Sequence, residues 1–468
     1  MPILRFTSSA DTTITNAFKP FSLDRALFSN MGAADSLEVF SISSSIGESE
    51  KSRVLVKFPI EKISSLRAAG TIPTSGNVNF YFNLYNVKHP ETLPRNYYMV
   101  VKPVSGSESW DEGFGLDIEN HTDLGRSGSI GFGTNWIYRN STSSWDSAGG
   151  DYLSEYAKSF YFDNGTENIS IDITDIIEAQ LTGVIPNSGL GVMLSGAYET
   201  AAANQSYYTK RFSARSSEYF YNRPLIEARW KSVVNDDRGD FYYESNNLSV
   251  QDNLQNIYFY NRFNGSLKDL PNSVVPFVKI LDEDKNLLTS SIQSAKVSTG
   301  IYSASFSITG TVEQTLSDIW YSGSNTYFTS QIEAKNRVFD DTKAEEEYVL
   351  AVTNLKSVYK SIENPDIRVF CRKKNWSPNI YSISYKIIET LTLKNLYFKV
   401  FRLADNFTVV DYGIDPIQYT LCSYDKNGNY FNLDMSMLEP GYSYGIKLMT
   451  LNGNTKVEYN QVFRFKVE

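Results

Sequence analysis

The chain has 468 residues, 41% hydrophobic and 14% aromatic, a length that suits about three domains of roughly 100–200 residues with ordinary cores. Its formal net charge of −9 excludes nucleic acid as an expected partner, because phosphate binding needs clustered Lys and Arg side chains. No stretch approaches the roughly 18 uninterrupted apolar residues of a membrane-spanning helix, so we expect no membrane partner.

The N-terminal half reads as a β-sandwich. Its first residues lack the basic region and apolar run of a secretory signal, so we expect synthesis in a cytosol without export by that route. Short alternating segments broken by Gly, Ser, Asn and Pro then predict a jelly roll over residues 1–233. Two runs place alternate residues on a buried face: Val54, Val56 and Phe58, and Val78, Phe80, Phe82 and Leu84.

One short helix is predicted in this region, from about Asp175 to Leu181. Thr174 is placed to cap its first free amides, and Gly183 suits the left-handed residue beyond its end. The isoleucines just before it, at 169, 171 and 173, alternate as in a strand.

A long polar excursion over residues 101–165 carries three of the six tryptophans. Exposed aromatic faces there could stack on sugar rings or anchor a partner subunit. Alternatively, the rings fold back and cover the edge of the jelly roll, and the sequence favours neither interpretation. The candidate contact residues are Trp110, Trp136, Tyr138 and Trp145.

The C-terminal half is predicted to hold two Ig-like domains. The composition changes at residues 231–239, which we interpret as a linker, and alternating Tyr302, Ala304, Phe306 and Ile308 indicate a sandwich over 240–350. Charged residues at 340–347 separate it from a second Ig-like sandwich over 351–468. The predicted class is therefore all-β, with an N-terminal jelly roll followed by two Ig-like β-sandwiches.

The histidines give no support for nucleophilic catalysis. Only His89 and His121 occur, each in a polar, turn-like context, so a Ser-His-Asp triad is not indicated. Cys371 and Cys422 belong to a different predicted domain from both histidines, which leaves a Cys-His pair unsupported. The two cysteines either form a disulfide or remain reduced core thiols.

Paired carboxylates are better explained by local structure than by glycoside hydrolysis. Asp111 and Glu112 are adjacent, so in a strand their side chains would point to opposite faces. Asp172 and Asp175 suit the start of a helix, where acidic residues favour the dipole. We therefore assign no catalytic residue and expect that the protein is not an enzyme.

Acidic runs offer oxygen ligands of the kind that calcium takes, but none has EF-hand spacing. Each is more simply a solvated turn, so we assign no metal ligand and no cofactor. The runs are Asp236-Asp237, Asp282-Glu283-Asp284 and Asp340-Asp341.

The order of segments over residues 8–230 resembles the DNRLRE domain family, a jelly-roll module of secreted and cell-surface proteins related to some carbohydrate-binding modules. The closing piece is the most specific, with Ser217-Glu218 followed by Arg223-Pro224 and a terminal strand. The resemblance keeps one structural calcium open. The matching segments are ADTTI, NMG followed by LEVF, SRVLVKFPIEKI, SESWDEG, ISIDITDIIEAQ, NSGLGVML and FSARSSEYFYNRPLIEARW.

The whole chain resembles virion proteins of tailed phages, in particular those of marine or cyanobacterial phages. The features that carry this resemblance are tandem β-modules, abundant Asn, Ser and Tyr, and the ending FNLDMSMLEPGYSYGIKLMT. It implies a non-enzymatic component of the neck, tail or capsid surface that binds other virion proteins as a symmetric homo-oligomer. The alternative function is a module that recognises a host glycan through the aromatic excursion, carried on a stalk of β-domains.

Overall fold

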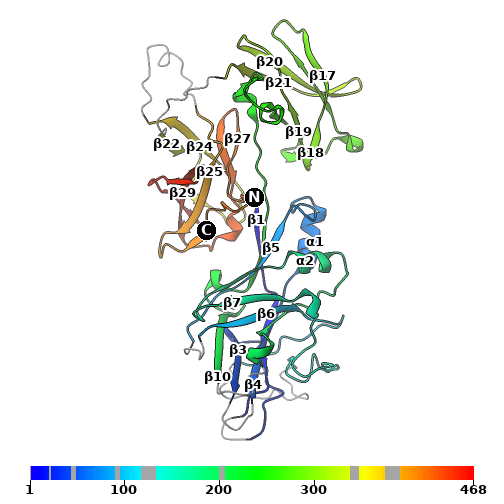
Figure 1. Ribbon diagram of the computed structural model, residues 1–468, viewed down its shortest axis with the longest axis vertical. Helices are drawn as coiled ribbons and strands as arrows, with labels where there is room; N and C mark the ends of the chain where they lie inside the picture. The colour runs from blue at the N-terminus through cyan, green and yellow to red at the C-terminus, as the bar shows by residue number, and fades with distance from the viewer. Residues whose placement is uncertain are drawn as a thin grey trace. The chain divides into compact units, whose positions relative to one another are not determined.

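The computed structural model describes residues 2–19, 23–43, 49–89, 95–116, 133–199, 206–337, 347–374 and 390–468. The protein is all-β, and the chain divides into two compact units, Pro2–Trp230 and Lys231–Glu468 (Figure 1). The division lies close to the predicted end of the first domain at residue 233. Among the described residues, no helix has the length and apolar character needed to cross a membrane.

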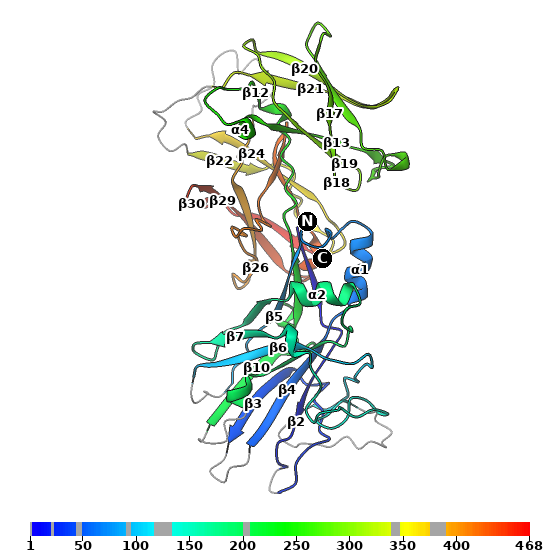
Figure 2. The same cartoon turned by 45° about the vertical axis from the view of Figure 1, so that its right-hand side comes forward.

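The first unit is a jelly-roll sandwich of two antiparallel sheets; Figure 2 labels several strands of the larger sheet and β5 of the smaller one. The smaller sheet has the order β1 (Ile3–Thr7), β11 (Leu225–Arg229), β5 (Asn79–Leu84) and β8 (Ile169–Asp172). The larger has the order β10 (Ser206–Ser213), β3 (Ser36–Ser43), β4 (Ser49–Lys57), β9 (Leu190–Leu194), β6 (Tyr97–Pro103) and β7 (Lys158–Phe162), with β2 (Ala10–Thr15) paired to β4.

The predicted alternations form the core between these sheets. Val54 and Val56 of β4 pack with Phe80 and Phe82 of β5 in one cluster, and all four side chains are fully buried. Because successive side chains of a strand point to opposite faces, the alternation in sequence fixes which side of each strand is apolar. This part of the sequence prediction is confirmed.

Two helices lie together in this unit, and only one was predicted. Helix α2 (Thr174–Leu181) ends before Gly183, which has a φ of +76° as expected. Thr174 is the first helical residue and its side chain caps no amide of the helix; its Oγ1 instead accepts a hydrogen bond from the Phe80 N–H at 2.9 Å. The predicted capping role is therefore wrong.

Helix α1 (Ile60–Ala68) was not predicted. Only Ile60 and Ile63 of this helix are buried, so its apolar stripe is too short to give a clear helical period. Tertiary contacts hold it in place: the Arg67 guanidinium forms two hydrogen bonds to the Glu178 carboxylate of α2, at 2.6 and 2.7 Å. Two parallel hydrogen bonds fix the orientation of the two side chains and also neutralise their charges.

The second unit begins with an Ig-like sandwich. One sheet has the order β12 (Phe241–Tyr242), β21 (Asn325–Lys335), β20 (Gln314–Ser322), β16 (Phe277–Leu281) and β17 (Leu287–Gln293). The other has the order β13 (Gln255–Tyr260), β19 (Ile301–Phe306) and β18 (Ala295–Ser298). The predicted row Tyr302, Ala304, Phe306 and Ile308 is buried in the core around Trp320, as expected.

A second Ig-like sandwich completes this unit. One sheet has the order β22 (Tyr348–Val352), β24 (Asp366–Lys373), β28 (Gly428–Asn432) and β27 (Ser423–Asp425). The other has the order β23 (Val358–Tyr359), β31 (Phe463–Val467), β29 (Ser443–Asn452), β25 (Leu396–Arg402) and β26 (Thr408–Val410), with β30 (Thr455–Glu458) paired to β29. Cys371 and Cys422 are free, buried thiols, and burial raises the pKa of Cys371 to about 12.

The segment predicted as a linker forms hydrogen bonds like those of a strand. The Asp236 N–H donates to the Tyr424 carbonyl at 3.0 Å, and the Tyr424 N–H donates to the Val234 carbonyl at 2.9 Å. Residues 234–236 thus run parallel beside β27 of the second Ig-like sandwich, before the chain enters the first one.

Candidate functional site

The three tryptophans of the excursion are buried. Trp110, Trp136 and Trp145 are 3%, 7% and 5% exposed, and they form a small second core with Ile14 and Leu55. Two indole N–H groups donate to carbonyl oxygens of the same domain, from Trp110 to Ser188 at 2.8 Å and from Trp145 to Asn135 at 2.9 Å. These rings cover the edge of the jelly roll, and their faces are not presented to an outside ligand.

Tyr138 is the member of the predicted set that lies nearest the surface. It is half-buried, and its ring stacks on Phe28 with a centroid separation of 5.9 Å. Phe28 is 42% exposed, so this stacked pair offers an aromatic surface at the edge of the excursion. Contact of Tyr138 with a partner remains a prediction.

Three of the segments quoted for the DNRLRE resemblance meet at Asp11, Glu112 and Arg215. The Arg215 N–H donates to Asp11 Oδ2 at 2.7 Å, and its guanidinium forms an ion pair with Glu112 at 2.7 Å. The Asp11 N–H donates to Glu112 Oε1 at 2.9 Å. Burial raises the pKa of Asp11 to about 7, the Arg215 N–H lowers it, and the Glu112 charge raises it.

Asn30 ties the excursion to this cluster from the buried side. Its Nδ2 donates to the carbonyl oxygens of Glu112 and Thr134 at 2.7 and 2.8 Å. Gly113 packs against it with a φ of +83°, and an added Cβ would lie 2.0 Å from Asn30 Oδ1. The cluster is a closed set of internal contacts, so we assign it to holding the excursion on the sandwich.

Two exposed tyrosines lie on the outer face of the larger sheet, beside the half-buried Tyr198. Tyr98 of β6 and Tyr161 of β7 are directly opposite each other, each 43% exposed, with ring centroids 4.8 Å apart. The ring centroid of Tyr198 lies 6.2 Å from that of Tyr98, and the Asn96 amide donates to the Tyr161 hydroxyl at 3.2 Å. We name Tyr98, Tyr161 and Tyr198 the tyrosine surface.

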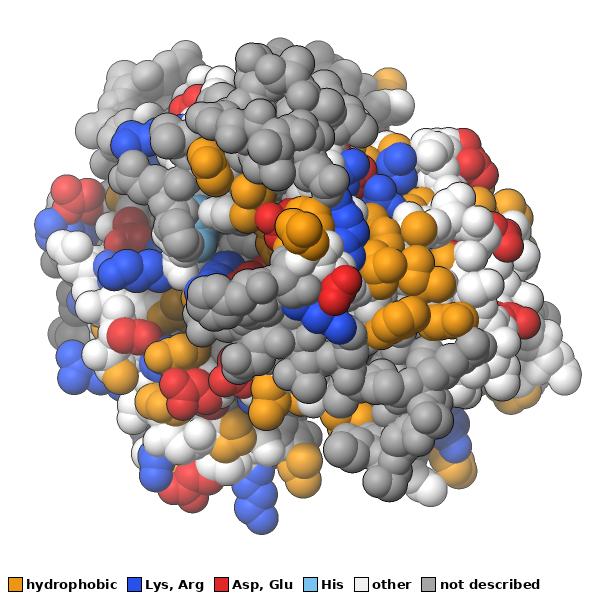
Figure 3. Space-filling model, turned by 90° about the horizontal axis from the view of Figure 1, so that it is seen from below, with side chains coloured by type: hydrophobic (Ala, Val, Ile, Leu, Met, Phe, Trp, Pro, Cys, Tyr) orange, Lys and Arg blue, Asp and Glu red, His pale blue; other side chains and the backbone are white. Residues whose placement is uncertain are grey.

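In the sequence, the tyrosine surface is indicated by the alternation of side chains along β6, where every second residue points away from the core. Tyr97 and Met99 enter the core, so Tyr98 between them must face outward. Figure 3 shows a patch of hydrophobic side chains, a class that there includes tyrosine, on the face of the molecule seen from below; the view does not identify the residues of this patch. Aromatic side chains with polar tips at a surface suit contact with proteins or sugars.

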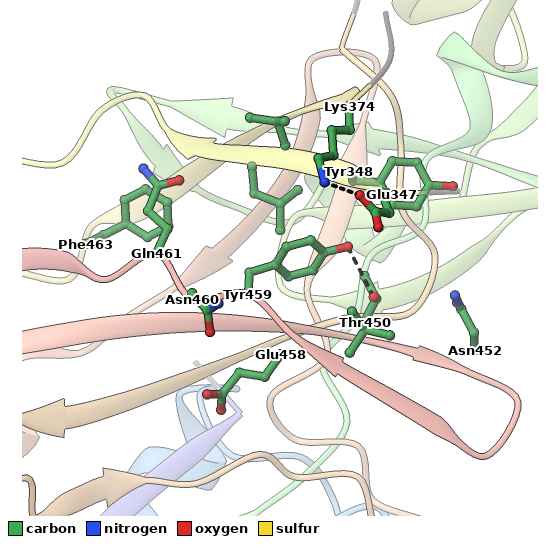
Figure 4. A pocket seen from close by; sticks show the side chains of 13 residues that line it. Glu347, Tyr348, Lys374, Thr450, Asn452, Glu458, Tyr459, Asn460, Gln461 and Phe463 are labelled. Carbon is green, nitrogen blue, oxygen red and sulfur yellow. Dashed lines mark hydrogen bonds and ion pairs between the residues drawn. The ribbon is translucent and has the colours of Figure 1, made fainter. Parts of the chain in front are cut away.

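The C-terminal Ig-like sandwich holds a cavity of about 500 Å³ between β22 and the residues that follow β30 (Figure 4). In it, the Tyr459 hydroxyl meets Thr450 Oγ1 at 3.3 Å, and Glu347 forms an ion pair with Lys374. Glu458 forms hydrogen bonds with Lys447 at 2.6 Å and with the Tyr412 hydroxyl at 3.1 Å. Both carboxylates are therefore held by neighbouring side chains, and the cavity offers mainly amide and hydroxyl groups to a ligand.

The carboxylates considered as candidates for glycoside hydrolysis form hydrogen bonds or ion pairs with other residues of this unit, or, for Asp111, contribute the backbone. Asp175 forms an ion pair with Lys158 at 2.7 Å, and Asp172 accepts a hydrogen bond from the Thr174 N–H at 2.8 Å. Glu112 is bound to Arg215. The exposed Asp111 contributes its backbone, whose carbonyl accepts from the Thr134 N–H at 2.7 Å.

The structure also shows the surroundings of His89 and of the acidic run at residues 282–284. His89 Nε2 lies 3.0 Å from the Gly165 carbonyl oxygen, and His121 falls outside the described residues. Asp282 accepts hydrogen bonds from Asn286 within a turn, while Asp340-Asp341 lies outside the described residues. Within the described ranges, no three His, Cys, Asp or Glu side chains gather as a metal site would require.

Comparisons with known proteins add little. No family model matches the chain, and no curated protein matches it. Among solved structures, it is similar to the N-terminal Ig1-2 module of the Drosophila receptor protein tyrosine phosphatase DLAR, with 10% identity over 46% of this chain and 91% of that one, at a TM-score of 0.14. A second match is to tandem Ig repeats of Dlar, with 11% identity over 46% of this chain and 90% of that one, also at 0.14. A likeness at this TM-score supports no conclusion about the chain.

Proposed function

We propose that the protein is a non-enzymatic virion component of a tailed phage, in the neck, tail or capsid surface, that assembles with other virion proteins. The observation that carries the proposal is the junction inside residues 231–468, where one short segment is bonded into both Ig-like sandwiches. A structural subunit must hold its modules at a fixed spacing, and a flexible tether would not do so.

Arg238 is the centre of this junction and is 5% exposed. Its guanidinium donates to Asp236 Oδ2 and Asp318 Oδ2, both at 2.7 Å, and to the Tyr258 carbonyl at 2.5 Å. Asp318 and Tyr258 belong to the first Ig-like sandwich, so the arginine fixes the segment to that module. These partners satisfy the two terminal nitrogens of the guanidinium, while its buried Nε has no hydrogen-bond partner among the described residues. Charge-assisted bonds of this kind give the contact a defined geometry.

Asp237, the neighbouring residue, joins the same segment to both modules. Its Oδ1 accepts from the Tyr424 hydroxyl of the second sandwich at 2.9 Å, and its Oδ2 accepts from the Asn256 N–H of the first at 2.9 Å. With the strand pairing beside Tyr424, these bonds make residues 234–238 a shared element. Such an element favours a stiff spacer.

Sedimentation of the purified chain tests the assembly part of the proposal. Virion components are repeated by the symmetry of the particle, so we expect a discrete homo-oligomer, or a complex with a co-expressed virion protein. A chain that stays monomeric at high concentration and binds no virion protein would contradict the proposal.

Glycan recognition is the second candidate function, and the tyrosine surface favours it. The neighbouring Tyr98 and Tyr161 rings, tilted by 44° to each other, offer aromatic faces on which sugar rings can stack, and the Asn96 amide adds a hydrogen-bonding group at the edge. A glycan array should show binding that the double variant Tyr98→Ala/Tyr161→Ala loses by tenfold or more. Tyr219→Ala is the matched control, since Tyr219 is 63% exposed and lies outside the surface. Equal binding by both variants would exclude this face.

A further inference from the structure

Lys210 is a lysine inside the first sandwich, 1% exposed, on strand β10 of the larger sheet. Its Nζ lies 4.8 Å from the centre of the Phe162 ring and 5.3 Å from that of Phe212. Lysines are almost never fully buried without a specific reason. The role proposed above for the chain makes no use of this amine.

Asn86 lies next to this amine. It follows β5 of the smaller sheet, and its Oδ1 accepts a hydrogen bond from Lys210 Nζ at 2.6 Å. The backbone of Asn86 is fixed twice, by an antiparallel bridge to Phe212 and by a hydrogen bond from its N–H to Asn168 Oδ1 at 2.8 Å. The amine and the carboxamide are therefore held in contact by β10 and by the chain that leaves β5 and bridges to β10.

Two backbone carbonyl groups orient the amine. Nζ also donates to the carbonyl oxygens of Gly165 and Glu167, at 3.0 and 2.8 Å. A neutral amine has two N–H bonds and one lone pair. Nζ thus has three oxygen acceptors in the structure, the third being Asn86 Oδ1. Once the group loses one proton, two N–H bonds can stay on the backbone carbonyl oxygens, and the lone pair takes the direction of the Asn86 carboxamide.

The Glu167 carboxylate lies in the same cluster, and one of its two oxygens accepts no hydrogen bond from the described residues. Glu167 Oε1 accepts from the N–H groups of Asn164 and Asp163 at 2.7 and 3.0 Å. Its Oε2 is buried and, like the hydroxyl of the fully buried Tyr97, has no hydrogen-bond partner among the described residues. The Glu167 charge interacts with both Lys210 and Tyr97.

Burial favours the neutral, reactive form of the amine. Burial lowers the pKa of Lys210 to about 7, although the Glu167 charge raises it. A desolvated lysine of this kind is a nucleophile near neutral pH, whereas an exposed lysine is almost wholly protonated. Burial also raises the pKa of Glu167, but the Asn164 and Asp163 N–H groups and the Lys210 charge bring it below its ordinary value, so the group is an ionised carboxylate near neutral pH.

We propose that Lys210 and Asn86 react with each other to form an intramolecular amide crosslink, with Glu167 as the proton-transfer group. The Lys210 Nζ–Asn86 Cγ bond forms and the Asn86 Cγ–Nδ2 bond breaks. One proton stays on the new amide nitrogen, and the other passes through the Glu167 carboxylate to Nδ2, which leaves as ammonia. The reaction needs no oxidant and no second substrate.

The crosslink would tie β10 of the larger sheet to the chain just after β5 of the smaller sheet. Like a disulfide, a covalent bond between distant residues restricts the unfolded chain and so stabilises the folded one. It needs no oxidising compartment. A module that bears force within an assembly would gain from such a bond, although the proposal rests on the geometry of the site alone.

Intact-mass spectrometry of the purified full chain is the direct test. We expect a mass below that of the sequence by one ammonia. Trypsin cannot cut after an acylated lysine, so the digest should contain peptide 68–88 joined to peptide 159–211. A chain at its full sequence mass, with free peptides ending at Lys88 and Lys210, would overturn the proposal.

Variants assign the roles. Lys210→Met and Asn86→Ala should each restore the full mass of their own sequence, and Glu167→Gln should leave the two reactants in place but unlinked. Lys158→Met, which removes a part-exposed lysine in an ion pair with Asp175, is the matched control and should keep the ammonia loss. A Glu167→Gln chain that is fully crosslinked would refute the role of Glu167, and loss of the crosslink in the control would refute the site.

Discussion

Asp11 is a buried carboxyl group whose folded-state pKa of about 7 lies above its ordinary value of 3.8. Between about pH 4 and 7 the folded state therefore binds more protons than the unfolded state. The stabilising contribution of this group is present in full below about pH 4 and is lost as the pH rises through 7.

The substitution Asp11→Asn tests this assignment, because the amide keeps the shape and cannot ionise. Relative to the natural chain, the variant should gain stability as the pH rises from about 5 to 8, by a few kcal/mol at about 1.4 kcal/mol per unit of pKa shift. Calorimetric unfolding of both chains across this range measures the difference. Parallel pH profiles would show that Asp11 does not titrate there.

Gly113 and Gly76 form a matched pair for testing the packing around Asn30. Both have positive φ, +83° and +85°, but a Cβ at Gly113 would lie 2.0 Å from Asn30 Oδ1, whereas at Gly76 nothing lies within 4 Å. Gly76→Ala should cost only about 1 kcal/mol of backbone strain. Gly113→Ala should cost roughly 2–4 kcal/mol, since it also displaces a buried, hydrogen-bonded side chain. Equal losses in urea unfolding would contradict the proposed packing.

At the scale of elements, we expect substitutions in the junction of residues 234–238 to have the largest effect on the free energy of unfolding. Arg238→Met would leave Asp236 and Asp318 buried without their cation, at a cost of about 3–5 kcal/mol near neutral pH. Burial already raises the pKa of Asp236 to about 6, so protonation in acid should relieve part of this cost. The loss should therefore shrink as the pH falls below about 6.

Calorimetry distinguishes coupling from simple destabilisation at this junction. The Ig-like sandwiches of residues 231–468 should unfold together in the natural chain and separately in Arg238→Met. Lys296→Ala is the control, because it removes an exposed ion pair with Asp269 and should cost less than about 1 kcal/mol. Separate transitions already present in the natural chain would refute a shared element.

The sequence predicted those elements whose signal is local. The alternating apolar residues of β4, β5 and β19 are buried as expected, because the period of two is a property of each strand by itself. Helix α1 was missed because its short apolar stripe gains support from α2, which lies far along the chain. The strand-like pairing of residues 234–236 depends on Tyr424 and so has no local signal either.

The candidate sites also depend on contacts between residues that are far apart in the sequence, which a local pattern does not reveal. A tryptophan in a polar excursion can be buried or exposed, and contacts with distant residues such as Ser188 decide it for Trp110. The pairing of Tyr98 with Tyr161 requires the strand register, and the meeting of Lys210 with Asn86 requires both sheets in place. Composition and motifs alone do not carry this information.

At the scale of the whole molecule, the chain contains a jelly roll and a pair of Ig-like sandwiches, and each of these modules has broad sheet faces. Broad faces of β-sandwiches supply interface area, and repetition by symmetry multiplies weak contacts into a stable assembly. The proposed virion role therefore requires a fixed number of copies in each particle.

Quantitative mass spectrometry of purified phage particles tests this requirement most directly. We predict that the chain is present after extensive washing, at a copy number equal to a small multiple of the symmetry of the neck, the tail or the capsid. Its absence from the particles, or an amount that varies between preparations, would contradict the account.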